Sequence, residues 1–210
     1  MIDIGISQET VNHIHAVLNG LPDADKKVLR PAMARGLSAA RTTTAKEVKK
    51  TYHISQTAFK NNSFIKIKNV TQVNGGIIGS IQYSGQSIPL IRFNVTPKTP
   101  TPRKDAVTVS VKKTESPVKF NNAFIAQMPA KHTGVFERKG TWLMSTRKNK
   151  GKTVNTMHNE KIKELFGPSV PSMAGNTYVM DKVEARVKEV INKRIEHEIE
   201  RLLNQNGGSL

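Results

Sequence analysis

Apolar residues recur at intervals of three and four in three stretches of this chain, which is the spacing of an amphipathic helix. The first stretch, residues 7–20, follows Ser7, a residue type suited to cap a helix, and ends at Gly20 and Pro22. The second, residues 24–52, is rich in small side chains, so we expect neighbours on more than one side of it. The third runs from about residue 177 to 204. The three apolar stripes are Val11, Ile14, Val17, Leu18 and Leu21; Leu29, Met33, Leu37, Ala40, Thr44 and Val48; and Val183, Val187, Ile191, Ile195, Ile199 and Leu202.

Between the second and third helices the pattern changes to the alternation that is typical of strands. Pro89 favours an edge strand, because proline cannot donate a hydrogen bond to a neighbouring strand. We expect a turn at Lys139–Gly140, and short helices at 53–62, capped by Ser55, and at 158–165. The predicted strands cover residues 63–70, 75–85, 87–95, 107–111, 120–128 and 132–144.

The order of these elements predicts the class of fold. N-terminal helices, a central run of mostly antiparallel strands and hairpins, and a long C-terminal helix are typical of an α+β protein. We expect a single domain over residues 1–210, with extended loops at 96–106, where three X-Pro steps occur, and at 145–153. Residues 205–210 are predicted to form a flexible tail.

Composition limits the size of the core and the chemistry available. Apolar residues make up 37% of the 210-residue chain and aromatic residues 5%, so we expect a modest core, partly completed by contacts with other chains. Cysteine is absent, which excludes disulfides and thiolate catalysis. No apolar run reaches the roughly 20 residues that span a bilayer, and the mixed, acidic N-terminus does not resemble a signal peptide.

The net charge of +17 is concentrated in the middle of the chain. Residues 1–25 carry four acids and no Lys or Arg, residues 26–152 carry 25 Lys or Arg against four acids, and residues 153–210 carry eight of each. Such an excess favours nucleic acid, an anionic membrane or an acidic protein as partner, although positive charge can also simply keep an oligomer soluble. The basic loops suit contacts with nucleic-acid phosphates that do not depend on the base sequence. The residues that could make these contacts are Lys98, Arg103, Lys104, Arg147, Lys148, Lys150 and Lys152.

No residue set in the sequence predicts catalysis, a cofactor or a metal site. The six histidines lack ligand spacing, and Asp23 and Asp25 resemble helix caps more than a catalytic pair. We therefore expect a protein that is not an enzyme. An alternative function is left open by residues 53–62, where a turn and a helix resemble a helix-turn-helix and Gln56, Lys60 and Asn61 could read bases in a standalone DNA-binding protein.

A series of short motifs carries a resemblance across most of the chain. "RPAMARGLSAARTTTAKEVKKTYHIS" is followed by "SIPLIRFNV", "VTVSVKK", "NNAFIAQM", "GVFERKG" and "IKELFGPSVPSM", and then by the long C-terminal helix. In this order the motifs resemble the minor tail protein Z family of long-tailed bacteriophages and prophages, over about residues 24–204.

The resemblance implies a structural virion protein, a tail-completion or neck subunit that forms a ring at the head–tail junction. It implies as partners other copies of the chain, the tail terminator and the head connector. Double-stranded DNA would pass nearby and be contacted without sequence specificity. The expected locations are the virion tail or neck and, during assembly, the host cytoplasm.

Two motifs receive a structural interpretation. We expect "GVFERKG" to be a hairpin with Arg138 and Lys139 at its tip. We expect the segment from Phe166 to Met173 to be a rigid turn into the last helix, serving either as a plain connection or as a contact with a neighbouring subunit. The turn and interface residues are Phe166, Gly167, Pro168, Val170, Pro171 and Met173.

Overall fold

The computed structural model describes residues 2–18, 21, 23–61, 64–73, 76–100, 106–128, 131–149 and 152–205. The fold is α+β with a long C-terminal helix and antiparallel sheets, as predicted. Two compact units are formed. Unit 1 comprises Met1–Lys49, Phe59–Gln86 and Val170–Leu210; unit 2 comprises Lys50–Ala58 and Ser87–Ser169. The sequence predicted a single domain, whereas the polypeptide crosses between these two units four times.

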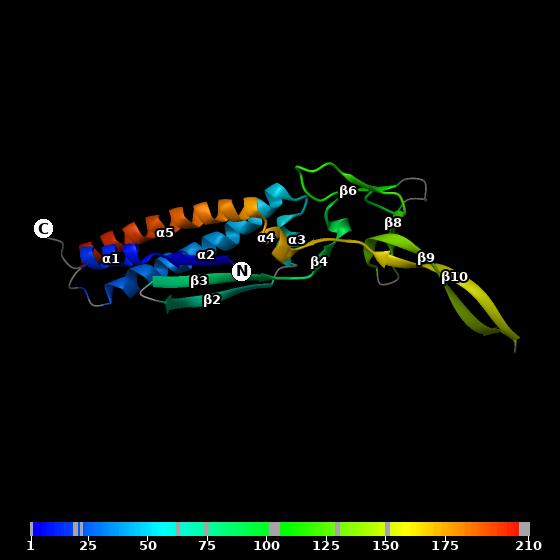
Figure 1. Ribbon diagram of the computed structural model, residues 1–210, viewed down its shortest axis with the longest axis horizontal. Coiled ribbons are helices and arrows are strands. Elements are labelled where there is room, and N and C mark those ends of the chain that lie inside the picture. Colours follow the sequence, from blue (N-terminus) through cyan, green and yellow to red (C-terminus); the bar gives the residue numbers. More distant parts are fainter. Residues whose placement is uncertain are drawn as a thin grey trace. The chain divides into compact units, whose positions relative to one another are not determined.

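The two long helices of unit 1 confirm the predicted apolar stripes, whereas in the first helix Val11 and Ile14 are buried but Val17 is 40% exposed. Ser7 caps α1 (Gln8–Val17), accepting a hydrogen bond from the Thr10 backbone N–H at 3.4 Å. Every predicted stripe residue of α2 (Ala24–Thr51) is buried. In α5 (Thr177–Gln205) every predicted stripe residue except Ile199 is buried. Both helices can be followed in Figure 1.

Helix α2 packs on two sides, as its small residues predict. On one side, a Cβ added to Gly36 would lie 2.7 Å from Cγ1 of Ile191 in α5, so only glycine permits this approach. On the other side, Met33 and Leu37 contact Gly79 of the sheet, where an added Cβ would lie 2.9 Å from the Met33 sulfur. The core of unit 1 therefore lies on both flanks of α2.

The sheet of unit 1 has three strands in the order β1-β3-β2, and both pairings are antiparallel. Its strands are β1 (Ile2–Ile6), β2 (Phe64–Val73) and β3 (Gly76–Ser84). β2 and β3 correspond to predicted strands, whereas β1 was not predicted. The signal was present, because Ile2, Ile4 and Ile6 alternate with Asp3 and Gly5.

Unit 2 consists mainly of short antiparallel strands. β5-β6-β7 and β10-β9-β8 are three-stranded, and β11 pairs with β4 alone. Pro89 ends β4, so the predicted edge position is confirmed. The strands are β4 (Ser87–Pro89), β5 (Asn94–Thr96), β6 (Val107–Ser110), β7 (Val118–Phe120), β8 (Ala123–Gln127), β9 (Thr133–Asn149), β10 (Lys152–Glu164) and β11 (Phe166–Ser169), with a 3-10 helix, η1 (Leu90–Arg92), after β4.

Three predictions about the region after residue 132 were wrong. The predicted helix at 158–165 falls almost entirely within β10. Of the predicted loop at 145–153, residues 145–149 belong to β9 and 152–153 to β10, while 150–151 lie outside the described residues. The predicted turn at Lys139–Gly140 lies inside β9; Gly140 has φ +68, but it sits where the β9–β10 register shifts. Local charge and turn signals were overridden by long-range strand pairing, which periodicity within a window does not report.

Two shorter helices complete the chain. α3 (Gln56–Asn61) confirms the predicted helix at 53–62, and its cap is Ser55, whose hydroxyl accepts from the Ala58 N–H at 3.0 Å. α4 (Val170–Ala174) precedes α5. Of the predicted 96–106 loop, residues 97–100 and 106 are neither helix nor strand, and 101–105 lie outside the described residues, as do 206–210 of the predicted tail.

Candidate nucleic-acid interface

Most of the positive charge belongs to unit 2. This unit carries 17 Lys or Arg against five Asp or Glu, whereas unit 1 carries 16 against 11. The formal charges are therefore +12 and +5. An anionic partner would be attracted mainly to unit 2.

The longest feature of unit 2 is a two-stranded ribbon. β8 pairs with β9 only from Thr133 to Glu137, whereas β9 and β10 stay paired out to Asn149 and Lys152 (Figure 1). We call residues 138–162 the ribbon, because Arg138 pairs in register with Ile162. It contains seven Lys or Arg and one acid, Glu160, and within the described residues it has no third strand. A hairpin of two strands is marginal in water by itself, so this one would gain stability from a partner.

The base of the ribbon is fixed by contacts with side chains. The Arg138 guanidinium lies 4.8 Å from the ring centroid of Phe124, and Phe124 packs against Phe136 at 6.1 Å. His132 Nε2 and Glu164 Oε1 are 2.7 Å apart, joining the two ends of the hairpin. The ribbon therefore leaves the sheet from an ordered base, although Arg138 and Lys139 are near this base and not at a tip.

The predicted anion-facing residues are distributed between the ribbon and the Pro-rich segment. Arg147 and Lys148 lie on β9, Lys152 lies on β10, and Lys148 pairs in register with Thr153. Lys98 is exposed in the segment after β5. Arg103, Lys104 and Lys150 lie outside the described residues. The fold thus brings Arg147, Lys148 and Lys152 together at one end of the ribbon.

The predicted turn from Phe166 to Met173 is a strand followed by a helix. Gly167 lies in β11, where an added Cβ would come within 2.7 Å of the Phe93 ring, and Pro168 is in the same strand. Val170 and Met173 are buried in α4, which also contains Pro171. Phe166 is 50% exposed, so within the chain it is not buried like Val170 and Met173, and its predicted contact with a neighbouring subunit stays a prediction. The boundary between the two units falls between Ser169 and Val170.

The segment that resembled a helix-turn-helix has a short helix and is held by backbone contacts with residues 111 and 112. α3 has six residues, and Gln56 and Lys60 are on it. Just before it, the His53 N–H donates to the Val111 carbonyl at 2.9 Å, and Tyr52 forms a bridge to Lys112. A recognition helix normally presents several turns to the major groove. Nothing in this geometry favours base reading.

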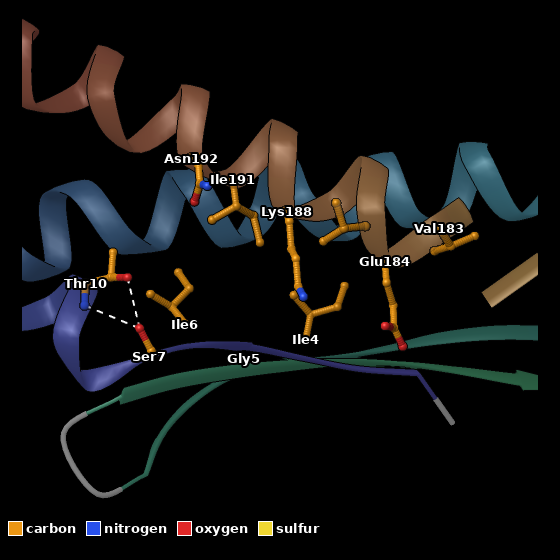
Figure 2. Close-up of a pocket in the computed structure, with 11 residues that line it drawn as sticks. Ile4, Gly5, Ile6, Ser7, Thr10, Val183, Glu184, Lys188, Ile191 and Asn192 are labelled. Carbon is orange, nitrogen blue, oxygen red and sulfur yellow. Dashed lines mark hydrogen bonds between the residues drawn. The ribbon is translucent and has the colours of Figure 1, made fainter. Parts of the chain in front are cut away.

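Unit 1 has an apolar groove between β1 and α5. Its cavity volume is about 430 Å³. Figure 2 shows Ile4 and Ile6 of β1 facing Ile191 of α5, with Glu184 and Lys188 along the helix. The remaining lining residues are Gly5, Ser7, Thr10, Val183, Val187 and Asn192. This groove was not predicted from the sequence, because β1, which forms one of its walls, was not predicted.

A buried carboxylate on α5 is part of the scaffold of unit 1. The Glu198 side chain is 2% exposed, pairs with Arg194, and accepts a hydrogen bond from Nε of Arg201 at 2.7 Å. Burial raises the pKa of Glu198, but the Arg201 hydrogen bond and the two arginine charges outweigh burial, so this pKa lies below its usual value. The ionised form is therefore the stable one in the folded chain.

The described residues contain neither a cluster of metal ligands nor a helix suited to cross a membrane. In the part of the chain that the structure describes, no three His, Cys, Asp or Glu side chains are grouped so that they could hold a metal ion. No helix among the described residues is both long and apolar enough to cross a membrane.

Comparisons with protein-family models, with curated proteins and with solved structures found no match to this chain.

Proposed function

We propose that this chain is a structural virion protein, a tail-completion or neck subunit that forms a ring at the head–tail junction of a long-tailed phage. The proposal starts from the motif series that ends in "IKELFGPSVPSM". Its partners are further copies of the chain, the tail terminator and the head connector. Its locations are the virion and, before assembly, the host cytoplasm.

One observation carries the proposal, namely the ribbon. It combines seven Lys or Arg with a single acid, Glu160, and has no third strand among the described residues. A cationic ribbon of this kind can reach along a DNA backbone or a neighbouring subunit, and either contact would supply the stability that two strands lack. Phosphate contacts fix position but carry no sequence information, which suits a channel through which any DNA must pass.

Assembly is the first test. Purified protein examined by mass photometry and negative-stain microscopy is expected to form rings of a single stoichiometry. Proteomics of purified particles is expected to find the chain in tails. A protein that stays monomeric in solution and is absent from particles would remove the proposal.

DNA contact is the second test, made with matched variants. Replacing Arg147, Lys148, Lys150 and Lys152 by Gln is expected to flatten the slope of log affinity against log salt by about 3 to 4, because each lost phosphate contact contributes about 0.9. The control removes the same charge from four exposed unit 1 residues, Lys27, Arg30, Lys46 and Lys193, and is expected to leave the slope nearly unchanged.

The outcomes of the DNA test are distinct. Equal loss of slope in both variants would mean that the positive charge acts only in bulk and that the ribbon has no special role. Binding that depends on base sequence and falls when Gln56 and Lys60 become Ala would favour the standalone DNA-binding protein instead.

A further inference from the structure

The three-stranded sheet of unit 1 has two open edges. Within the described residues, β1 and β2 each pair with β3 and with no other strand. Alternate residues of each outer strand therefore direct backbone N–H and C=O groups away from the sheet, where they can accept another strand. Exposed edges of this kind are usually covered or paired in the working protein.

The apolar groove lies along the open edge of β1. Gly5 lines this groove, and because glycine has no side chain, the β1 backbone itself borders the groove at that point (Figure 2). The opposite wall is α5, with Val183, Val187 and Ile191 as its apolar residues. A strand added beside β1 would therefore find free backbone groups and, for its alternate side chains, the small apolar area that Ile4, Ile6 and Ile191 still expose.

The other edge of the same sheet has the sequence that fits this groove. β2 begins Phe-Ile-Lys-Ile-Lys, an alternation of aliphatic residues with lysines. β2 carries Lys66 and Lys68 and no acid, whereas β1 carries Asp3 and no Lys or Arg. The two edges are thus opposite in charge as well as open.

We propose that β2 of one copy pairs with β1 of the next copy and lies along the groove between β1 and α5. β1 and β2 run parallel to each other, since both are antiparallel to β3, so a sheet that continues from copy to copy joins them as a parallel pair. The contact uses two different surfaces, and repetition of such a contact gives a ring where the rotation between copies closes and an open filament where it does not. A second copy covers both edges, whereas an unrelated strand on β1 would leave β2 open.

This interface rests on the proposed function, and the absence of cysteine allows a direct test. Gly5 pairs with Ile78, while Lys66 and Lys68 pair with Gln82 and Ser80. Because alternate residues of β3 share a face, Gly5, Lys66 and Lys68 occupy the same face of the sheet. A Cβ added to Gly5 meets no atom within 4 Å, so a cysteine fits there.

The experiment compares double and single cysteine variants of the full chain after mild oxidation, on non-reducing gels with mass spectrometry of the linked peptides. Gly5→Cys/Lys66→Cys or Gly5→Cys/Lys68→Cys is expected to give a ladder of dimer, trimer and larger species. The single variants are expected to stay unlinked, and an equimolar mixture of two single variants is expected to stop at the heterodimer. Gly5→Cys/Arg41→Cys, with its second cysteine at an exposed position of α2, is the matched control and is expected to give no ladder.

Each outcome decides a separate question. Rings by mass photometry without cross-links in either double variant would overturn this interface while the proposed function stands. Efficient dimers from Gly5→Cys alone would show a two-fold contact between β1 strands and would also overturn it. If neither rings nor cross-linked ladders form, the result counts against both the proposed function and this interface.

Discussion

Glu198 is a buried charge that forms ion pairs with two arginines of its own helix, α5. Its carboxylate is held between Arg194 and Arg201, whose side chains are 40% and 42% exposed. Glu198→Gln keeps the shape but removes the charge and turns one of the two acceptor oxygens into an NH2 donor, so one of the two arginines loses its acceptor. Since these arginines still reach water, we expect a loss of about 1–2 kcal/mol in the free energy of unfolding, read from urea denaturation. Glu196→Gln, at an exposed position, is the control and is expected to change little.

The same carboxyl predicts a pH dependence. Its pKa is lowered in the folded chain, so the folded state binds fewer protons than the unfolded state at acid pH. The stabilisation is therefore complete above the unfolded pKa of about 4.3 and is lost as pH falls through the folded value. Melting temperatures of wild type and Glu198→Gln are expected to converge on acidification from pH 6 to pH 3. A constant difference over that range would contradict the assignment.

At the scale of elements, the contact between α2 and α5 depends on Gly36. Gly36→Val places methyl groups where Ile191 now lies, so we expect a loss of about 1–3 kcal/mol in the free energy of unfolding. Ile191→Ala makes room for the added methyl groups. The double variant is therefore expected to lose less free energy of unfolding than the sum of the losses in the two single variants. Additive losses in urea denaturation would mean that the two side chains do not compete for the same space.

The ribbon is expected to be separable from the fold. Met144 pairs with Met157, so replacing residues 145–156 by Asn-Gly joins the strands by a tight turn. The segment removed contains Arg147, Lys148, Lys150 and Lys152. We expect the free energy of unfolding to change by less than about 1 kcal/mol, because among the described residues the removed parts of β9 and β10 pair only with each other. The affinity for DNA is expected to fall. A large loss of stability would show that the ribbon supports the core.

The helices could be predicted and the ribbon could not, for a physical reason. The stripe from Leu29 to Val48 lies within one element, and its period is recorded locally in the sequence. Residues 158–164 became a strand because they pair with β9, more than ten residues away along the chain. The basic residues were identified from composition alone, but their arrangement at the end of a hairpin came from this pairing. The groove depends on β1 meeting α5, which lie at opposite ends of the sequence.

At the scale of the whole molecule, the two units have different surface properties. Unit 1 offers a sheet with two open edges and an apolar groove, while unit 2 carries the net charge of +12. Variants at the β1 edge are therefore expected to affect assembly, whereas variants in the ribbon are expected to affect contact with DNA. Mass photometry and salt-dependent binding on the same two variants would show whether the effects separate.

The most direct measurement is the copy number and position of this chain in a reconstruction of the particle that carries it. The account predicts a symmetric ring at the head–tail junction, with the ribbon near the DNA path. A particle that lacks the chain, or a reconstruction in which it is a single copy with its Lys- and Arg-rich ribbon pointing into bulk solvent, would contradict the account.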